Sequence, residues 1–292
     1  MPTAAASPAS PASPAFLTAY DAVLALWPPG TSTTDVATPY GTTRLLTHGA
    51  EDALPVLLLP GGGATATGWY AMAAALGLTH RVHAVDLVGE PGRSTPAAGR
   101  PIRTVDDLTA WLHALLDGLR LDSAALVGHS YGAWIALHHA LRAPERVDGL
   151  VLLDPTNCFT GFRPRYLLRA LPTLLRPTPA RTAAFLRWET GGAELDPRWL
   201  GLLARAAEFP GVRPVTGPRP TRADLAGLKP PTLLLLAEHS RAHDSARVAV
   251  RAGNTVPHLE TATLAGATHH TLPAGAPPET YELVTRFLEG RT

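Results

Sequence analysis

The chain of 292 residues is long enough for one large domain, and its 46% hydrophobic and 17% charged residues are ordinary for a globular protein. A net charge of +1 gives no reason to expect a nucleic-acid or membrane-surface partner, and no window is apolar for long enough to cross a membrane. The single cysteine, Cys158, excludes an intramolecular disulfide and suits a reducing compartment, so we expect a cytoplasmic protein.

The N-terminal residues 1–15 form a repeat of Pro, Ala and Ser without a charged side chain. Such a segment cannot bury enough surface to fold, so we expect it to be disordered. It also lacks the basic start and the apolar run of a signal peptide. A short helix is expected over Phe16–Trp27, because the Pro-Pro-Gly that follows stops it. Next, Asp35–Thr38 and Thr43–Thr47 flank a Pro-Tyr-Gly turn, which predicts a hairpin.

Further along the chain, short apolar runs alternate with helical patterns. The runs expected to form strands are Pro55–Leu59, Val82–Val85, Ala124–Val127 and Gly149–Leu153. The stretches expected to form helices are Trp69–Leu78, Val105–Leu119 and Tyr131–Leu141. This alternation predicts an α/β fold, with a mostly parallel sheet that carries helices on both faces.

The alternation is interrupted over residues 155–228, a segment with several prolines, no clear strand, and helical patches. It resumes with Thr232–Leu236, Ser245–Ala252, Leu259–Leu264 and Glu279–Leu288. We therefore expect a core of residues 16–154 and 229–292. A helical insertion, residues 155–228, would lie over the C-terminal edge of the sheet, where open α/β sheets bind ligands.

A candidate nucleophile lies between a predicted strand and a predicted helix, in Gly128-His129-Ser130-Tyr131-Gly132. Glycines two residues before and after a serine allow a sharp turn that lifts the serine Oγ above the sheet edge. The helix that follows places its N-terminus near the negative charge that develops during acyl transfer. The pattern in this context predicts Ser130 as a nucleophile.

Four segments together resemble the α/β-hydrolase fold, of the serine-hydrolase type with a helical cap. LLLPGGG (57–63) resembles the family's strand and oxyanion loop, and VDLVGEPGRS (85–94) resembles its D-L-x-G-x-G-x-S loop with one residue added. VGHSYGA (127–133) is the nucleophile elbow, and LAGATHHTLP (264–273) resembles the histidine loop. The resemblance covers about residues 35–290. It implies a serine hydrolase that needs no cofactor or metal.

By this resemblance, the backbone N–H groups of Tyr131 and Gly62 form the oxyanion hole. Pro60 stands where the family often has a histidine, so the role of that histidine is absent. The run Gly-Ala-Thr-His that ends at His269 matches the family's G-x-G-H loop, which makes His269 the expected base. His270 is the alternative.

The acid of the triad departs from the usual pattern of the family. In many relatives it follows the strand Thr232–Leu236 in a G-x-x-D pattern, but this chain has Ser240 there. Some relatives carry the acid after the preceding strand, where this chain has Asp154, and Asp154 is our first choice. Asp244 could curl back toward the histidine, although it could equally cap the next helix. Glu238, or no acid at all, completes the set of alternatives.

We therefore expect hydrolysis of an ester or related acyl bond of a small molecule, through an acyl-enzyme intermediate. A C–C bond hydrolase, a lactonase or a perhydrolase could use the same residues. A non-catalytic ligand-binding protein on this scaffold is the alternative from another class. The insertion carries aromatic residues that could line a substrate pocket or form its own core: Phe159, Phe162, Tyr166, Trp188, Trp199 and Phe209.

Overall fold

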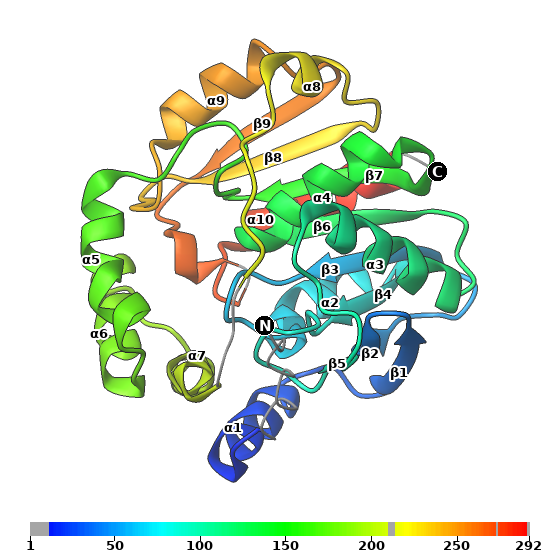
Figure 1. The fold of residues 1–292 in the computed structure, drawn as a ribbon. Helices are drawn as coiled ribbons and strands as arrows, with labels where there is room; N and C mark the ends of the chain where they lie inside the picture. Colours follow the sequence, from blue (N-terminus) through cyan, green and yellow to red (C-terminus); the bar gives the residue numbers. More distant parts are fainter. Residues whose placement is uncertain (1–11, 210–213, 273, 291–292) are drawn as a thin grey trace, which may run out of the picture.

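A mostly parallel sheet forms the centre of the computed structural model, which describes residues 12–209, 214–272 and 274–290 (Figure 1). Within these residues the order of the nine strands is β1-β2-β4-β3-β6-β7-β8-β9, and β5 pairs with β2. The pairs from β4 through β9 are parallel, and those that involve β1, β2 or β5 are antiparallel. The strands are β1 (Ser32–Thr38), β2 (Gly41–His48), β3 (Leu54–Leu59), β4 (His80–Val85), β5 (Thr95–Pro96), β6 (Ala124–His129), β7 (Val147–Leu153), β8 (Thr232–Ala237) and β9 (Leu259–Leu264). The predicted α/β fold and the predicted hairpin of β1 and β2 are confirmed.

Helices cover both faces of this sheet. Alternate residues of β3 separate between two apolar cores: Leu57 and Leu59 pack with α3, α4 and α9, while Val56 and Leu58 pack with α2 and α10. A strand buried on both faces needs apolar residues at successive positions, which explains the unbroken run of β3. The helices are α2 (Tyr70–Leu76), α3 (Val105–Gly118), α4 (Tyr131–Arg142), α9 (Ser245–Gly253) and α10 (Pro278–Glu289).

The segment between β7 and β8 contains helices and, in its described part, no strand. Its helices are α5 (Pro164–Leu175), α6 (Pro179–Glu189), α7 (Pro197–Arg205) and α8 (Arg222–Ala226), and α5, α6 and α7 each begin at a proline, which suits a first helical position. Figure 1 shows α5–α7 standing clear of the sheet and α8 beside α9. Leu225 of α8 belongs to the sheet core, so the helices that stand apart end before the predicted boundary at residue 228.

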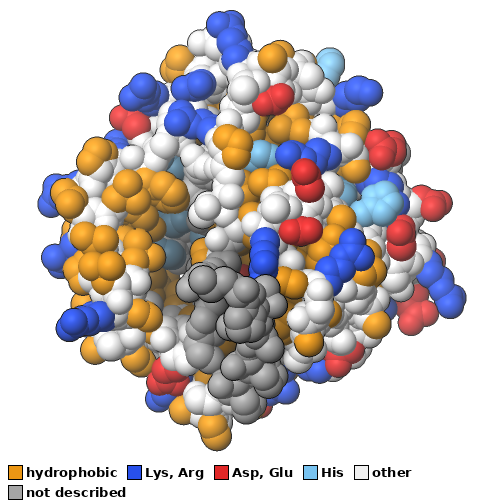
Figure 2. Space-filling model, in the orientation of Figure 1, with side chains coloured by type: hydrophobic (Ala, Val, Ile, Leu, Met, Phe, Trp, Pro, Cys, Tyr) orange, Lys and Arg blue, Asp and Glu red, His pale blue; other side chains and the backbone are white. Residues whose placement is uncertain are grey.

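Part of the outer surface of α5 is apolar. Leucines of α5 are exposed, and Figure 2 shows hydrophobic side chains gathered on the side of the molecule where α5 and α6 lie. The helix is amphipathic in its pattern, and Ala170 is its one buried residue. None of the helices in the described ranges is long and apolar enough to cross a membrane.

The first helix, α1 (Pro14–Leu24), begins earlier than the predicted Phe16. Ser13 caps it by accepting the N–H of Phe16 at 3.1 Å, and Pro14 occupies a first helical position. Residues 14–15 of the predicted disordered tail therefore belong to a helix, because the Ser-Pro pair is itself a helix start. Residues 1–11 of that tail lie outside the described residues.

Candidate active site

Ser130 sits on a strained turn between β6 and α4, with φ 53° and ψ −111°. Two glycines make this turn possible. A Cβ atom at Gly132 would lie 2.1 Å from the carbonyl oxygen of Leu59, and one at Gly128 would lie 2.5 Å from the amide nitrogen of Ala133. The strand and the helix therefore approach as closely as the Gly-x-Ser-x-Gly pattern predicts, and Ser130 is left at the C-terminal edge of the sheet.

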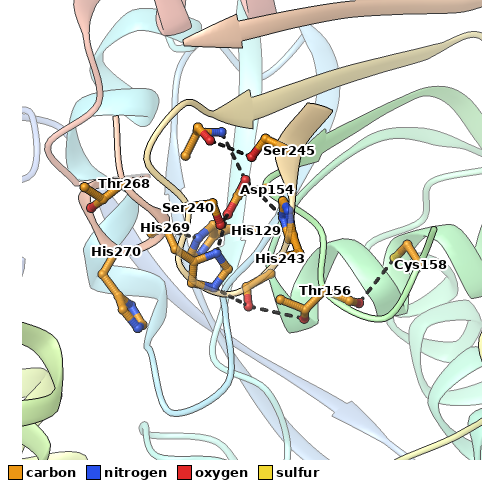
Figure 3. A network of polar contacts seen from close by, with 12 residues as sticks. His129, Asp154, Thr156, Cys158, Ser240, His243, Ser245, Thr268, His269 and His270 are labelled. Carbon is orange, nitrogen blue, oxygen red and sulfur yellow. Dashed lines mark hydrogen bonds and ion pairs between the residues drawn. The ribbon is translucent and has the colours of Figure 1, made fainter. Parts of the chain in front are cut away.

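Three of the predicted site residues meet at this edge. The Oγ of Ser130 lies 2.9 Å from Nε2 of His269, and Nδ1 of His269 lies 2.6 Å from Oδ2 of Asp154 (Figure 3). His269 comes from the short η4 helix (His269–Thr271) that follows β9, and Asp154 directly follows β7. The three side chains thus come from three separate loops, and hydrogen bonds run in series from the hydroxyl to the carboxylate.

Asp154 is fully buried, and both of its carboxylate oxygens have partners. Oδ1 accepts the N–H of Ala237 at 3.0 Å and lies 3.1 Å from Nε2 of His243. Oδ2 accepts the hydroxyl of Ser240 at 2.7 Å in addition to the contact with His269. Burial alone would raise the pKa of Asp154, but attraction to His243 and the hydrogen bond and charge of His269 hold it well below the usual value. The carboxylate is therefore ionised at neutral pH.

His269 has the electrostatic environment of a base beside a buried acid. Burial by itself lowers the pKa of its imidazole, but the hydrogen bond and charge of Asp154, with the charge of Glu189, raise it above the ordinary value. The neighbouring imidazoles behave differently. Burial lowers the pKa of His129 to about 3 and holds that of His270 well below its usual range. Both therefore stay neutral where His269 titrates.

The alternative base and acids lie elsewhere. The backbone N–H of His270 donates to Oε2 of Glu189 at 3.1 Å, and its ring packs edge-on to Phe185. Asp244 caps α9, since its Oδ1 accepts the N–H of Arg247 at 3.0 Å. Glu238 is half exposed, and its Oε2 accepts the N–H of Gly266 at 2.8 Å. Among the described contacts, none of these three side chains forms a hydrogen bond to Ser130 or His269, as Asp154 does to Nδ1 of His269.

The predicted oxyanion residues lie next to each other. A Cβ atom at Gly62 would be 3.7 Å from the Cβ of Tyr131, so the glycine loop after β3 passes directly over the start of α4. The sequence did not reveal a neighbour of this loop, Glu90, whose Oε2 accepts the N–H of Gly63 at 3.1 Å. Burial raises the pKa of Glu90 to about 7. Glu90 belongs to the loop of residues 85–94, which has one residue more than the family's pattern. That extra residue was the only feature of the sequence that marked this loop as unusual.

The aromatic residues of the insertion divide into two groups. Phe159 and Trp199 are buried, and Phe209 packs against Phe16 with ring centroids 4.6 Å apart. The others form an aromatic wall, defined here as Phe162, Tyr166, Phe185 and Trp188, whose rings lie 5.3–6.3 Å from one another. Members of the wall are only partly buried, and Phe185 contacts His270, the neighbour of His269. Figure 2 shows a hollow beside this part of the molecule, with histidine side chains inside it.

Comparisons with known proteins show the family and the fold of this chain. The profile of the alpha/beta hydrolase family matches residues 56–283. The chain is 30% identical over 284 residues to carboxylesterase YbfK of Bacillus subtilis, covering 94% of each protein. The crystal structure of carboxylesterase CesB (YbfK) from that organism superposes with a TM-score of 0.87 at 29% identity, covering 94% of this chain and 97% of that one. A naproxen esterase (carboxylesterase NP) from Bacillus subtilis also gives a TM-score of 0.87, at 27% identity, and covers 96% of this chain and 100% of the other.

Proposed function

This chain belongs to the α/β-hydrolase family, and on that premise we propose that it is a serine hydrolase that cleaves a carboxylic ester of a small molecule. The observation that carries the proposal is the 2.9 Å contact between Ser130 Oγ and His269 Nε2, with Asp154 on the other ring nitrogen at 2.6 Å. A nucleophile, a base and a group that orients the base are the parts that acyl transfer requires. Relatives described as carboxylesterases support the same reaction.

In the first half-reaction, Ser130 Oγ attacks the ester carbonyl carbon while His269 Nε2 takes the hydroxyl proton. Asp154 stabilises the resulting imidazolium, because its buried carboxylate lies against Nδ1. The tetrahedral intermediate then collapses, the C–O bond to the alcohol breaks, and His269 gives its proton to the leaving oxygen. The product of this step is an acyl-enzyme on Ser130.

In the second half-reaction, His269 takes a proton from water, and the hydroxide attacks the acyl carbonyl. Collapse returns the proton to Ser130 and releases the carboxylic acid. We assign the oxyanion in both steps to the N–H groups of Gly62 and Tyr131. Each donor in such a site contributes about 3 kcal/mol to the barrier in related chemistry.

The insertion supplies the substrate side of this proposal. We propose that α5–α7, within the predicted insertion of residues 155–228, act as a cap and that the aromatic wall contacts the apolar part of the ester. The wall is partly exposed and ends at His270, beside His269. A relative described as a naproxen esterase is consistent with a bulky apolar group in this place. A series of p-nitrophenyl esters of increasing acyl length measures how large that group can be.

A fluorophosphonate probe tests the chemistry, because it labels only an activated serine. We expect the native protein to be labelled and to hydrolyse p-nitrophenyl esters, and Ser130→Ala to do neither while keeping the native melting temperature. No labelling of the native protein, or equal labelling of the variant, would instead favour a ligand-binding protein on this scaffold. The cytoplasmic location and a role without nucleic-acid or membrane partners stay predictions.

A further inference from the structure

A second histidine lies against the acid of the proposed triad. The imidazole of His243 is 2% exposed, and its Nε2 is 3.1 Å from Oδ1 of Asp154 (Figure 3). His269 contacts the other oxygen, Oδ2, so the carboxylate lies between two imidazoles. The proposed reaction uses only the imidazole of His269. The function of the second imidazole, that of His243, is therefore still to be explained.

The loop that carries His243 connects β8 to α9 and is held at several points. The hydroxyl of Ser245 donates to the carbonyl oxygen of Ala237 at 2.7 Å, which ties the two ends of the loop together. Ala242 is fully buried, and its carbonyl oxygen accepts the N–H of Arg163 at 2.8 Å. A loop anchored in this way fixes the ring of His243 in one place, against Asp154.

Asp154 needs such a partner because a buried carboxylate is costly unless each oxygen has donors. Its contact with His269 changes during the reaction, since that ring gains and loses a proton. The N–H of Ala237, the hydroxyl of Ser240 and the ring of His243 remain unchanged, and of these only an imidazole can also carry positive charge. His243 is therefore the group best placed to keep the carboxylate ionised throughout the cycle.

We propose that His243 is a positioning residue, which holds Asp154 in its charged form and in the orientation that His269 requires. The site is then a series of four side chains: Ser130, His269, Asp154 and His243. This inference rests on the proposed function, since it assumes that Asp154 serves His269 during ester hydrolysis.

Other titratable groups surround this pair and bear on any pH test. They are His129 of the elbow, His270 of the histidine loop, Tyr166 of α5 and Glu189 of α6. Burial lowers the pKa of His129 and of His270, so both are neutral above mildly acidic pH. Burial raises the pKa of Tyr166 above its usual value, so the phenol stays protonated. Burial also raises the pKa of Glu189, so this carboxyl can add a second ionisation to the pH profile.

The test compares His243→Leu and His243→Gln by measuring kcat/KM for one ester across pH. Leucine removes the imidazole that lies 3.1 Å from Oδ1, so burial raises the pKa of Asp154 with less opposition. We expect the acidic limb of the profile to move to higher pH, and kcat/KM at neutral pH to fall about 10- to 100-fold. Glutamine places an uncharged amide N–H near the Nε2 position. We therefore expect a smaller loss of kcat/KM and a smaller shift of the acidic limb than with leucine.

The matched control is His239→Leu, because His239 lies in the same loop with a side chain that is 64% exposed. This substitution should leave kcat/KM and its dependence on pH unchanged. If the His243 variants keep the native profile, or lose rate by equal factors at every pH, the positioning role is overturned. Labelling by the fluorophosphonate separates the two proposals, since a labelled native protein with unaltered His243 profiles contradicts only this inference. If His243→Leu does not fold, His243→Gln alone decides.

Discussion

Asp154 combines two properties that restrict the residue at its position. Its backbone has φ 42°, a left-handed conformation that Asp, Asn and Gly tolerate better than other residues. Its side chain is fully buried, and the N–H of Ala237, the hydroxyl of Ser240 and the imidazoles of His243 and His269 lie within 3.1 Å of its oxygens. Asparagine fits the same backbone and nearly the same volume, so Asp154→Asn removes the charge with little other change.

We expect Asp154→Asn to lower kcat for ester hydrolysis by about 10³- to 10⁴-fold, because a neutral amide stabilises neither the correct tautomer nor the imidazolium of His269. The comparison is Asp244→Asn, in which the N-cap of α9 remains a good cap. Its turnover and melting temperature should match those of the native protein. The assignment of the acid is wrong if Asp244→Asn loses most activity while Asp154→Asn keeps it.

Among the secondary-structure elements, the junction of β6 and α4 has the least room. Gly132 lies where a Cβ atom would be 2.1 Å from a backbone oxygen of β3, and backbone cannot move aside as a side chain can. We expect Gly132→Ala to lower the free energy of unfolding by about 2–4 kcal/mol, measured by urea denaturation.

Gly201 of α7 is the control, since nothing lies within 4 Å of its Cβ position. Alanine there should stabilise the protein by about 0.5–1 kcal/mol, because it reduces the entropy lost in forming the helix. Equal effects of the two substitutions would show that the elbow is less crowded than these distances indicate.

The order of elements was predictable because this chain marks them locally. The buried strands β3 and β8 contain unbroken apolar runs, and Thr104 caps α3 with its side chain on the N–H of Asp107, as its sequence position predicts. The elements that the sequence did not predict depend on tertiary contacts. The two residues of β5 extend the sheet only because they meet β2, and α8 joins the sheet core through Leu225 although it lies within the predicted insertion.

The same distinction applies to the candidate site. Ser130 lies in a local pattern that names it directly, and the histidine loop restricted the base to His269 or His270; the structure brings Ser130 and His269 to one sheet edge. The acid could come from the loop after β7, which holds Asp154, or from the loop after β8, which holds Glu238 and Asp244. Only the folded sheet shows which of these loops lies beside His269. His243 and Glu90 have no pattern at all, because their roles depend on which loop folds against which.

At the scale of the whole molecule, α1 connects the insertion to the sheet. Phe16 packs in an apolar cluster with Trp199 and Leu202 of α7, while the hydroxyl of Tyr20 donates to the buried Asp86 at 2.9 Å. The insertion is therefore held on two sides, by α1 and by the contacts of Glu189 with the histidine loop. Movement of α5–α7 relative to the sheet would have to break the apolar cluster with α1 or the part-buried contact of Glu189 with His270.

Buried carboxyl groups also set how the stability of the molecule depends on pH, and they act in opposite directions. Asp154 has a lowered pKa, so the stability it contributes is present at neutral pH and is lost as the pH falls through its folded pKa. Asp86, Glu90 and Glu189 have pKa values raised by burial. For these groups the folded state holds the proton more tightly than the unfolded chain, so the protein loses stability as the pH rises.

Glu90 gives this effect its clearest test, since burial raises its pKa from 4.5 to about 7. Below 4.5 the group is protonated in both states, whereas above 7 it is charged in both and its burial costs roughly 3 kcal/mol. Glu90→Gln keeps an acceptor for the N–H of Gly63 without that cost. Urea denaturation should therefore find the variant more stable at mildly alkaline pH by up to about 3 kcal/mol and equal to the native protein near pH 4. The exposed Glu51→Gln controls for the amide, and a difference independent of pH would contradict the buried, titrating carboxyl.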